Sequence, residues 1–333
     1  MFNWNKMLLI SLLIWSTLIS VTSHSWLGIW MGLEINLMSF IPLIVENKNM
    51  IMSEAMLSYF LIQTLTSINF LFFIILTKMF SNFQWITNIV MNLSLLMKMG
   101  AAPFHFWFPK VMSGLSWLNC FILSTWQKIT PMIAISFCMN YNTILMAILL
   151  SALVGAMGGI NQTSIRVIMS FSSISHMSWM LTSTLISLNL WMIYFSVYLI
   201  LNSMMMLMFS INNFFFLNQM FNTKMNSSMF LSININMLSL GGLPPFLGFF
   251  PKWLVIYYMS MSNMLTMIIF LTLMTLITLS FYMNILFSSV IVNYSQTKWF
   301  ISSFKTKPMI FMYLINSISL FSLLIISFLN FSF

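Results

Sequence analysis

The fold is decided by residues 98–131, KMGAAPFHFWFPKVMSGLSWLNCFILSTWQKITP. This stretch has the length and hydrophobicity of membrane spans, yet it carries Lys98 and Lys128. Two further charges, Glu34 and Lys252, lie in equally apolar segments. A charge at the centre of a membrane helix costs about 2.5–3.5 kcal/mol on insertion scales, so the four together cost on the order of 10 kcal/mol. We therefore interpret these residues as parts of a functional site or pathway.

Composition limits the fold class. The chain has 333 residues, of which 60% are hydrophobic and 5% are charged, and this balance excludes a soluble globular domain. A chain in lipid must form helices or a closed barrel, and these runs are apolar throughout instead of alternating. The sequence thus predicts one all-α membrane domain over 1–333, a polytopic bundle. Its net charge of +9 comes from scattered basic residues, unlike the clustered patch that binds nucleic acid.

About 20 apolar residues per span predict about eleven transmembrane helices. We expect them near 7–22, 26–45, 54–77, 86–112, 114–138, 143–159, 164–187, 190–217, 229–258, 261–290 and 308–331. Cationic loops stay on the side from which a protein is inserted. With this count, the loops on the N-terminal side carry Lys6, Lys48, Lys110, Arg166, Lys224, Lys298, Lys305 and Lys307. Only Lys78 lies on the other side, so the charges support the count.

Two spans are interrupted by similar segments, GAAPFHFWFPK at 100–110 and GGLPPFLGFFPK at 241–252. Both read small, small, any residue, Pro, and then Phe-Pro-Lys. The expected breaks lie at Gly100, Pro103, Gly241, Gly242, Pro244 and Pro245. Matched broken helices predict antiporter-like inverted repeats, 7–138 and 143–290, followed by a C-terminal helix at 308–331. Because proline removes a ladder hydrogen bond, the carbonyls of Leu240 and Gly241 should be left free; a structural kink repacked by neighbours is the alternative.

The titratable residues share their helical faces with hydroxyl groups. Thr87 and Ser94 precede Lys98 on one face, Ser124 and Thr125 precede Lys128, and Ser172, Ser173 and Ser183 accompany His176. Buried lysine and histidine can exchange protons reversibly, and Glu34 offers an anionic partner. The alternatives are lysines that snorkel to the interface, a histidine that only packs, and a fixed Glu34 salt bridge. Gly28 and Gly32 form a GxxxG motif, which predicts a close helix contact.

Cofactor motifs are missing from the sequence. It contains neither a dinucleotide-binding GxGxxG after a strand, nor a Walker loop, nor an iron–sulfur cysteine set, nor a haem ligand pair. Cys120 and Cys138 have neither disulfide nor metal-site spacing. We expect no cofactor and no metal on this chain, so that the energy for ion movement comes from a gradient or from partner subunits.

Five motifs resemble a known family. They are MGLEINLMSFIPL, KMGAAPFHFWFPKVMSGLSW, STWQKITPM, GGINQTSIRVIMSFSSISHMSWM and SLGGLPPFLGFFPKW, in this order. They closely resemble the subunit 2 family of mitochondrial NADH:ubiquinone oxidoreductase, respiratory complex I, and its insect members most. The resemblance implies a proton-pumping, antiporter-like subunit of the membrane arm in the mitochondrial inner membrane, with the N-terminus on the matrix side. By the family pattern, Glu34, Lys98, Lys128 and Lys252 match the proton-channel residues and His176 lies on the central hydrophilic axis.

The resemblance also implies the surroundings of the chain. NADH, FMN, iron–sulfur clusters and ubiquinone would belong to partner subunits, so the chain would be part of a proton-translocating NADH:ubiquinone reductase without a redox site of its own. Its partners would be other complex I subunits, above all neighbouring membrane-arm subunits, and membrane lipids. Two other functions stay open from the residues: a stand-alone cation/proton antiporter, and a structural scaffold with vestigial charges.

Overall fold

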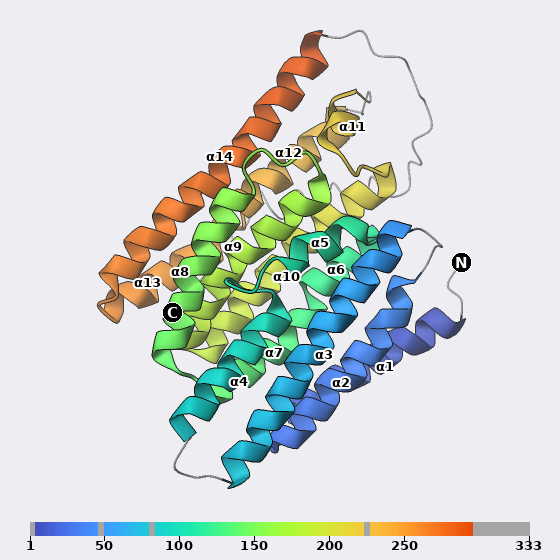
Figure 1. Cartoon of the computed structure of the whole chain (residues 1–333). Helices are drawn as coiled ribbons and strands as arrows, with labels where there is room; N and C mark the ends of the chain where they lie inside the picture. The colour runs from blue at the N-terminus through green and yellow to red at the C-terminus, as the bar shows by residue number, and fades with distance from the viewer. Residues whose placement is uncertain (1–3, 46–49, 80–83, 223–226, 296–333) are drawn as a thin grey trace, which may run out of the picture. The chain divides into compact units, whose positions relative to one another are not determined.

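The computed structural model describes residues 4–45, 50–79, 84–222 and 227–295 (Figure 1). Within these ranges the elements are helices, apart from an isolated antiparallel bridge between Ser164 and Phe216. The chain forms two compact units, Met1–Ser151 and Ala152–Phe333. Each unit is described by itself below.

The first unit contains helices that follow one another along the chain and pack with their neighbours (Figure 1). They are α1 (Trp4–Thr22), α2 (Trp26–Ile44), α3 (Met50–Met79), α4 (Gln84–Met99), α5 (Trp107–Gly114), α6 (Trp117–Ser124) and α7 (Trp126–Phe137). Helix α8 (Tyr141–Gly158) crosses the boundary between the units. Helix α4 packs against both α3 and α7, and α5 packs against α3, which brings the broken α4–α5 segment into the core of this unit.

The second unit is built around a pair of long helices that are joined by a single residue, Ser187. Its helices are α9 (Ile165–Ile186), α10 (Leu188–Asn212), α11 (Leu217–Asn222), α12 (Ser227–Gly241), α13 (Phe249–Met261) and α14 (Leu265–Ser295). The Ser187 hydroxyl accepts a hydrogen bond from the Leu190 amide and so caps the start of α10. This cap fixes the turn between α9 and α10.

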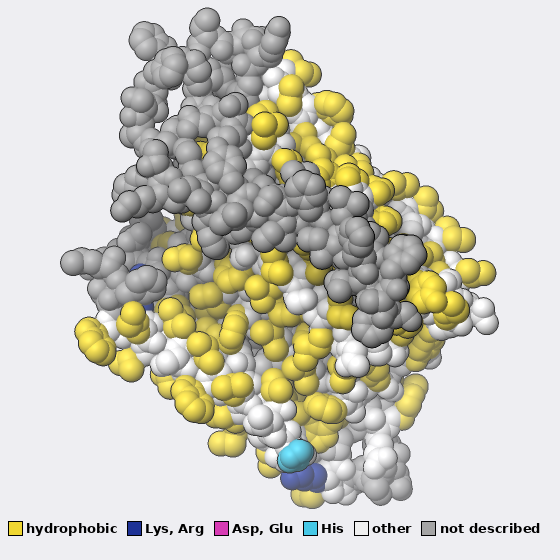
Figure 2. Space-filling model, turned by 180° about the vertical axis from the view of Figure 1, so that it is seen from behind, with side chains coloured by type: hydrophobic (Ala, Val, Ile, Leu, Met, Phe, Trp, Pro, Cys, Tyr) yellow, Lys and Arg dark blue, Asp and Glu magenta, His cyan; other side chains and the backbone are white. Residues whose placement is uncertain are grey.

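Apolar surface dominates the described part of the molecule. In Figure 2 the described part of the visible face is mostly yellow, with charged groups confined to its edges. Among the described residues, helices α1, α2, α3, α8, α10 and α14 are long and apolar enough to cross a membrane. Helix α9 has 22 residues, but it is rich in serine and almost entirely buried, so it is shielded from lipid by its neighbours. These features are those of a polytopic helical membrane bundle.

Ten of the eleven expected spans coincide with helices or with pairs of half-helices, and the expected helix at 308–331 lies outside the described residues. The two broken helices are confirmed, as α4–α5 and α12–α13. The expectation of a continuous helix over 114–138 was wrong, because the backbone is interrupted at Thr125 between α6 and α7. There the Phe121 carbonyl accepts from the Thr125 amide and from the Thr125 and Ser124 hydroxyls. Hydroxyls that bond back to a helix carbonyl in this way bend the helix.

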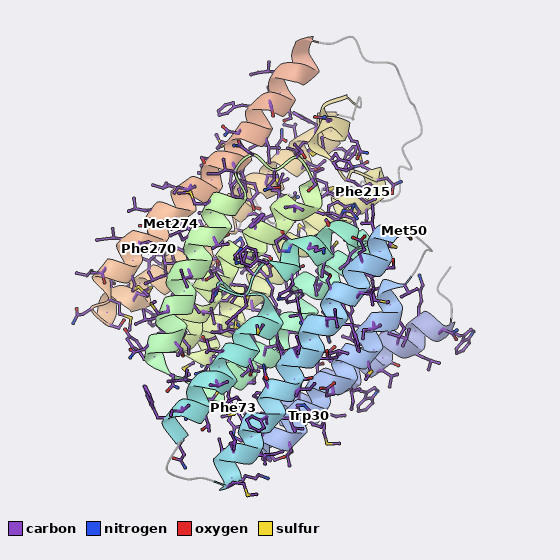
Figure 3. The ribbon with its side chains drawn as sticks, viewed as in Figure 1. Trp30, Met50, Phe73, Phe215, Phe270 and Met274 are labelled. Atoms are coloured by element: carbon purple, nitrogen blue, oxygen red, sulfur yellow. The ribbon has the colours of Figure 1, made fainter. Side chains whose placement is uncertain are left out.

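The GxxxG motif forms the contact that the sequence predicted. A Cβ atom placed on Gly32 would lie 2.6 Å from the Ser20 Cβ and 2.9 Å from the Ser16 carbonyl oxygen, and one on Gly28 would lie 2.7 Å from the Ser23 Cβ. Helices α1 and α2 therefore touch backbone to backbone. On its other side α2 is tied to α3, since Trp30, labelled in Figure 3, donates from Nε1 to the Ser67 carbonyl at 3.2 Å.

We expect Gly32→Val to separate α1 from α2, because the new side chain has no space against the Ser16 backbone. Overpacking of this kind costs about 1–3 kcal/mol. A thermal melt of the detergent-solubilised protein should show a lower midpoint. Met31→Val is the matched control, since Met31 is exposed on the same helix and its replacement should leave the midpoint unchanged. An equal midpoint for both variants would contradict the close contact.

Candidate functional site

The two helix breaks have the same backbone design. At the end of α4, the Gly100 amide donates to the Met97 carbonyl and the Ala101 amide to the Leu96 carbonyl. At the end of α12, the Gly242 amide donates to the Ser239 carbonyl and the Leu243 amide to the Leu238 carbonyl. Both patterns are Schellman caps, with a glycine in the left-handed conformation, at φ +72° for Gly100 and +82° for Gly242. Glycine is the residue that adopts this conformation without a steric cost.

This geometry corrects the alignment of the two segments. The sequence pattern paired Gly100 with Gly241, whereas the left-handed glycines are Gly100 and Gly242. With that shift, the segments match residue by residue through Pro103 and Pro245 to Lys110 and Lys252, and α5 and α13 begin at equivalent positions. The two lysines nevertheless differ, because Lys110 is exposed and Lys252 is 7% exposed.

Lys252 closes the second break. Its Nζ donates to the Gly241 carbonyl oxygen at 2.9 Å, so the last turn of α12 holds the ammonium group that α13 carries. The sequence predicted that the Gly241 carbonyl would be free of the helix ladder, and the lysine is its partner. A hydrogen bond to a charged group contributes about 1.5–3 kcal/mol, and the C-terminal end of a helix also favours a cation. The break therefore offers a built site for a buried positive charge.

At the first break, neutral side chains donate to the carbonyls at the end of α4. The Lys98 carbonyl accepts from Gln63 Nε2 at 3.1 Å, and the Met97 carbonyl accepts from Trp107 Nε1 at 3.1 Å. Gln63 comes from α3 and Trp107 from α5, so three helices meet at the end of α4. The carbonyls here are satisfied without a lysine, which leaves the ammonium group of Lys98 for other contacts.

Lys98 lies in the last turn of α4 and is 6% exposed. Glu34, half-buried on α2, interacts with it electrostatically. An anion nearby offsets part of the cost of burying the ammonium group. The structure thus brings together the lysine and the carboxylate that the sequence singled out, and the burial of Lys98 contradicts the alternative that it snorkels to the surface.

Lys128 is the most deeply buried of the four charges, at 1% exposure. Its Nζ lies 5.3 Å from the centroid of the Phe108 ring, a cation–π distance. Phe108 follows the first break on α5 and also packs against Gly100. Ser124 and Thr125 are buried as predicted, but Ser124 ends α6 and Thr125 is the interruption itself, so they do not continue the face of α7 that carries Lys128.

His176 lies on α9 and is 6% exposed. Its Nδ1 is 2.9 Å from the hydroxyl oxygen of Tyr194 on α10. The predicted hydroxyl stripes are buried: Thr87, Ser94, Ser172, Ser173 and Ser183. Each of these hydroxyls donates to a carbonyl one turn earlier in its own helix, which satisfies the buried O–H group.

Sequence reasoning missed several neutral residues that hold the site. Gln127 Nε2 donates to Asn36 Oδ1 at 3.0 Å, which links α7 beside Lys128 to α2 beside Glu34. Asn92 Nδ2 donates to the Cys138 carbonyl at 2.6 Å, and the Cys138 thiol donates to Asn92 Oδ1 at 2.9 Å. An amide side chain inside an apolar span is costly without a partner, and this signal could have identified them. Their partners could not be read from the sequence.

Known proteins share this architecture and sequence. A family model described as "NADH:quinone oxidoreductase/Mrp antiporter, TM" matches residues 23–280. The NADH-ubiquinone oxidoreductase chain 2 of the insect Anopheles gambiae is 47% identical over 324 residues, which cover 95% of this chain and 95% of the relative. The chain belongs to the NADH-ubiquinone oxidoreductase chain 2 family. The resemblance that the five motifs indicated, including that to insect members, is confirmed.

Solved structures of more distant proteins have the same fold. A chain of respiratory complex I from Thermus thermophilus, solved with bound aureothin, superposes with a TM-score of 0.84 at 18% identity, covering 96% of this chain and 77% of that one. A chain of the Mrp complex from Dietzia sp. DQ12-45-1b superposes with a TM-score of 0.74 at 16% identity, covering 83% of this chain and 59% of that one. The fold expected from the broken helices is thus that of this antiporter-like family.

We expect Gly242→Ala to expel the Lys252 ammonium group from the second break. A Cβ atom on Gly242 would lie 2.7 Å from Lys252 Nζ, and the left-handed backbone adds a strain of about 1–2 kcal/mol. Proton pumping by the assembled complex in vesicles should fall. Gly241→Ala is the matched control, because its Cβ would meet its nearest neighbour at an ordinary 3.6 Å. Equal pumping by the two variants would argue against a role for the Lys252 position.

Proposed function

We propose that the chain is a proton-translocating, antiporter-like membrane-arm subunit of respiratory complex I. NADH oxidation and ubiquinone reduction in partner subunits drive the movement of protons through this one. Glu34, Lys98, Lys128, His176 and Lys252 form the pathway: Glu34 senses the change in a neighbouring subunit, and the lysines and the histidine exchange protons. Each proton moved against the membrane potential requires about 2.3 kcal/mol per 100 mV.

One observation carries this proposal. Three lysines and a histidine are each no more than 7% exposed inside an apolar bundle, and Lys98 and Lys252 lie at the Schellman caps that end the two broken helices. Buried ionisable groups are costly, and helix ends inside a membrane bundle are where transporters of this architecture handle ions. Structural lysines would be expected at the ends of spans, where they reach water.

The same proposal implies the membrane, the orientation and the partner subunits of the chain. The chain lies in the mitochondrial inner membrane, with its N-terminus on the cation-rich matrix side. NADH, FMN, iron–sulfur clusters and ubiquinone are bound by partner subunits, and this chain has no redox site of its own. The equivalent backbones of 100–110 and 242–252 support two inverted repeats, 7–138 and 143–290.

A native gel of mildly solubilised membranes tests the assembly. Stained for NADH dehydrogenase activity, the gel should show a very large active band that contains peptides of this chain by mass spectrometry. Migration of the chain in a small inactive oligomer would instead favour a stand-alone cation/proton antiporter, and ion flux in vesicles would then be measured.

We expect Lys98→Gln and Lys252→Gln to lower coupled proton pumping at least about tenfold, because glutamine occupies similar space but cannot exchange a proton. The measurement is the rate of proton uptake per NADH oxidised in sealed vesicles. Lys110→Gln is the matched control, since Lys110 holds the position equivalent to Lys252 but is exposed.

Two outcomes would contradict the pathway. Normal pumping in both buried-lysine variants would remove their proposed role. A loss of assembled complex, with normal pumping by the fraction that assembles, would favour a structural scaffold.

A further inference from the structure

The second unit contains a cluster of buried polar side chains on α10, outside the residues of the proposed pathway. Helix α10 carries Tyr194, Tyr198 and Asn202 at intervals of four residues, so the three side chains lie on one face. All three are buried, at 1%, 3% and 2% exposure. They lie on a helix with a 25-residue apolar span, where polar groups are costly without a partner.

This face of α10 packs against His176 on α9. The Tyr194 hydroxyl oxygen is 2.9 Å from His176 Nδ1, and the Tyr198 ring centroid is 5.2 Å from that of the imidazole. Asn202 Nδ2 in turn donates to the Tyr198 hydroxyl at 3.3 Å. The one-residue connection at Ser187 holds the two helices in register. The imidazole is therefore held on one side by a hydrogen bond and on another by an aromatic ring.

The chemistry of this contact constrains the histidine. A neutral imidazole has one donor and one acceptor nitrogen, and the partner of one nitrogen decides which carries the proton. A phenol oxygen accepts hydrogen bonds, so the Tyr194 hydroxyl can accept from Nδ1–H in the charged ring and in the neutral tautomer that keeps its proton on Nδ1. One partner thus serves both protonation states without movement of the ring, and Nε2 of the neutral ring carries the free lone pair.

We propose that Tyr194 is the positioning residue of His176. By holding Nδ1, it fixes the orientation of the ring and makes Nε2 the nitrogen that exchanges the proton. No bond to carbon or oxygen is broken: one proton arrives at Nε2 and one leaves from Nε2. This inference rests on the proposed function, because it needs His176 to lie on the proton pathway.

A double-mutant cycle tests the proposal on the assembled complex in vesicles. The variants are Tyr194→Phe, His176→Gln and the two combined, with proton-pumping rate per assembled complex as the measurement. Tyr194→Phe should lower the rate about fivefold, the factor that corresponds to one neutral hydrogen bond. In the His176→Gln background the same change should have no further effect, because the hydroxyl would no longer have an imidazole to position.

The control is Tyr258→Phe, which removes the hydroxyl of another tyrosine of the second unit, one that is 45% exposed and packs on Tyr257. Pumping should be unchanged in this variant. An equal loss in Tyr258→Phe would mean that the loss of any tyrosine hydroxyl of this unit lowers pumping, and would overturn the proposal.

The outcomes separate this inference from the proposed function. If His176→Gln lowers pumping while Tyr194→Phe has no effect, or lowers it equally with and without His176, Tyr194 does not act through the histidine and the pathway stands. If His176→Gln leaves pumping unchanged, the histidine is not on the pathway and the inference fails with it.

Discussion

The hydrogen bond between the Lys252 ammonium group and the Gly241 carbonyl shows the constraint on which the rest of the structure depends. A bilayer supplies no water to satisfy a broken helix or a buried cation. A free carbonyl at a helix break and a buried ammonium group are each costly alone, and here the ammonium group donates to the carbonyl. The glycine and proline residues that end α12 and the lysine in the first turn of α13 therefore stabilise one arrangement, which a charge or a break in isolation would not.

The first break solves the same problem with different residues. Its carbonyls are satisfied by Gln63 and Trp107, so Lys98 is held by its place at a helix end and by the field of Glu34. The equivalent of Lys252 in this segment is Lys110, which lies at the surface. The two breaks thus share a backbone but differ in side chains. The buried lysine follows the cap in the second break, as Lys252, and precedes it in the first, as Lys98. The two breaks therefore carry their buried lysines at different positions, which a strict repeat would have made alike.

Neutral polar contacts set the geometry around these charges. Gln127 and Asn36 join the helices that carry Lys128 and Glu34, and Tyr194 holds His176. Hydroxyls of the serine and threonine stripes donate to carbonyls of their own helices, which offsets the cost of burying them. The interruption at Thr125 has a similar cause, because the Thr125 amide and the Ser124 and Thr125 hydroxyls all donate to the Phe121 carbonyl.

The sequence by itself determined the membrane bundle, ten spans within the described residues, both helix breaks and the charges inside apolar segments. Hydrophobic length, glycine and proline act locally, and the cost of a charge in lipid is independent of its partners. Only the tertiary structure decided that Gly242 and not Gly241 matches Gly100, that Thr125 interrupts a third helix, and that Lys110 is exposed while Lys252 is buried. Those outcomes depend on which side chain from a distant helix reaches a given carbonyl or ring, and no local pattern in the chain specifies that.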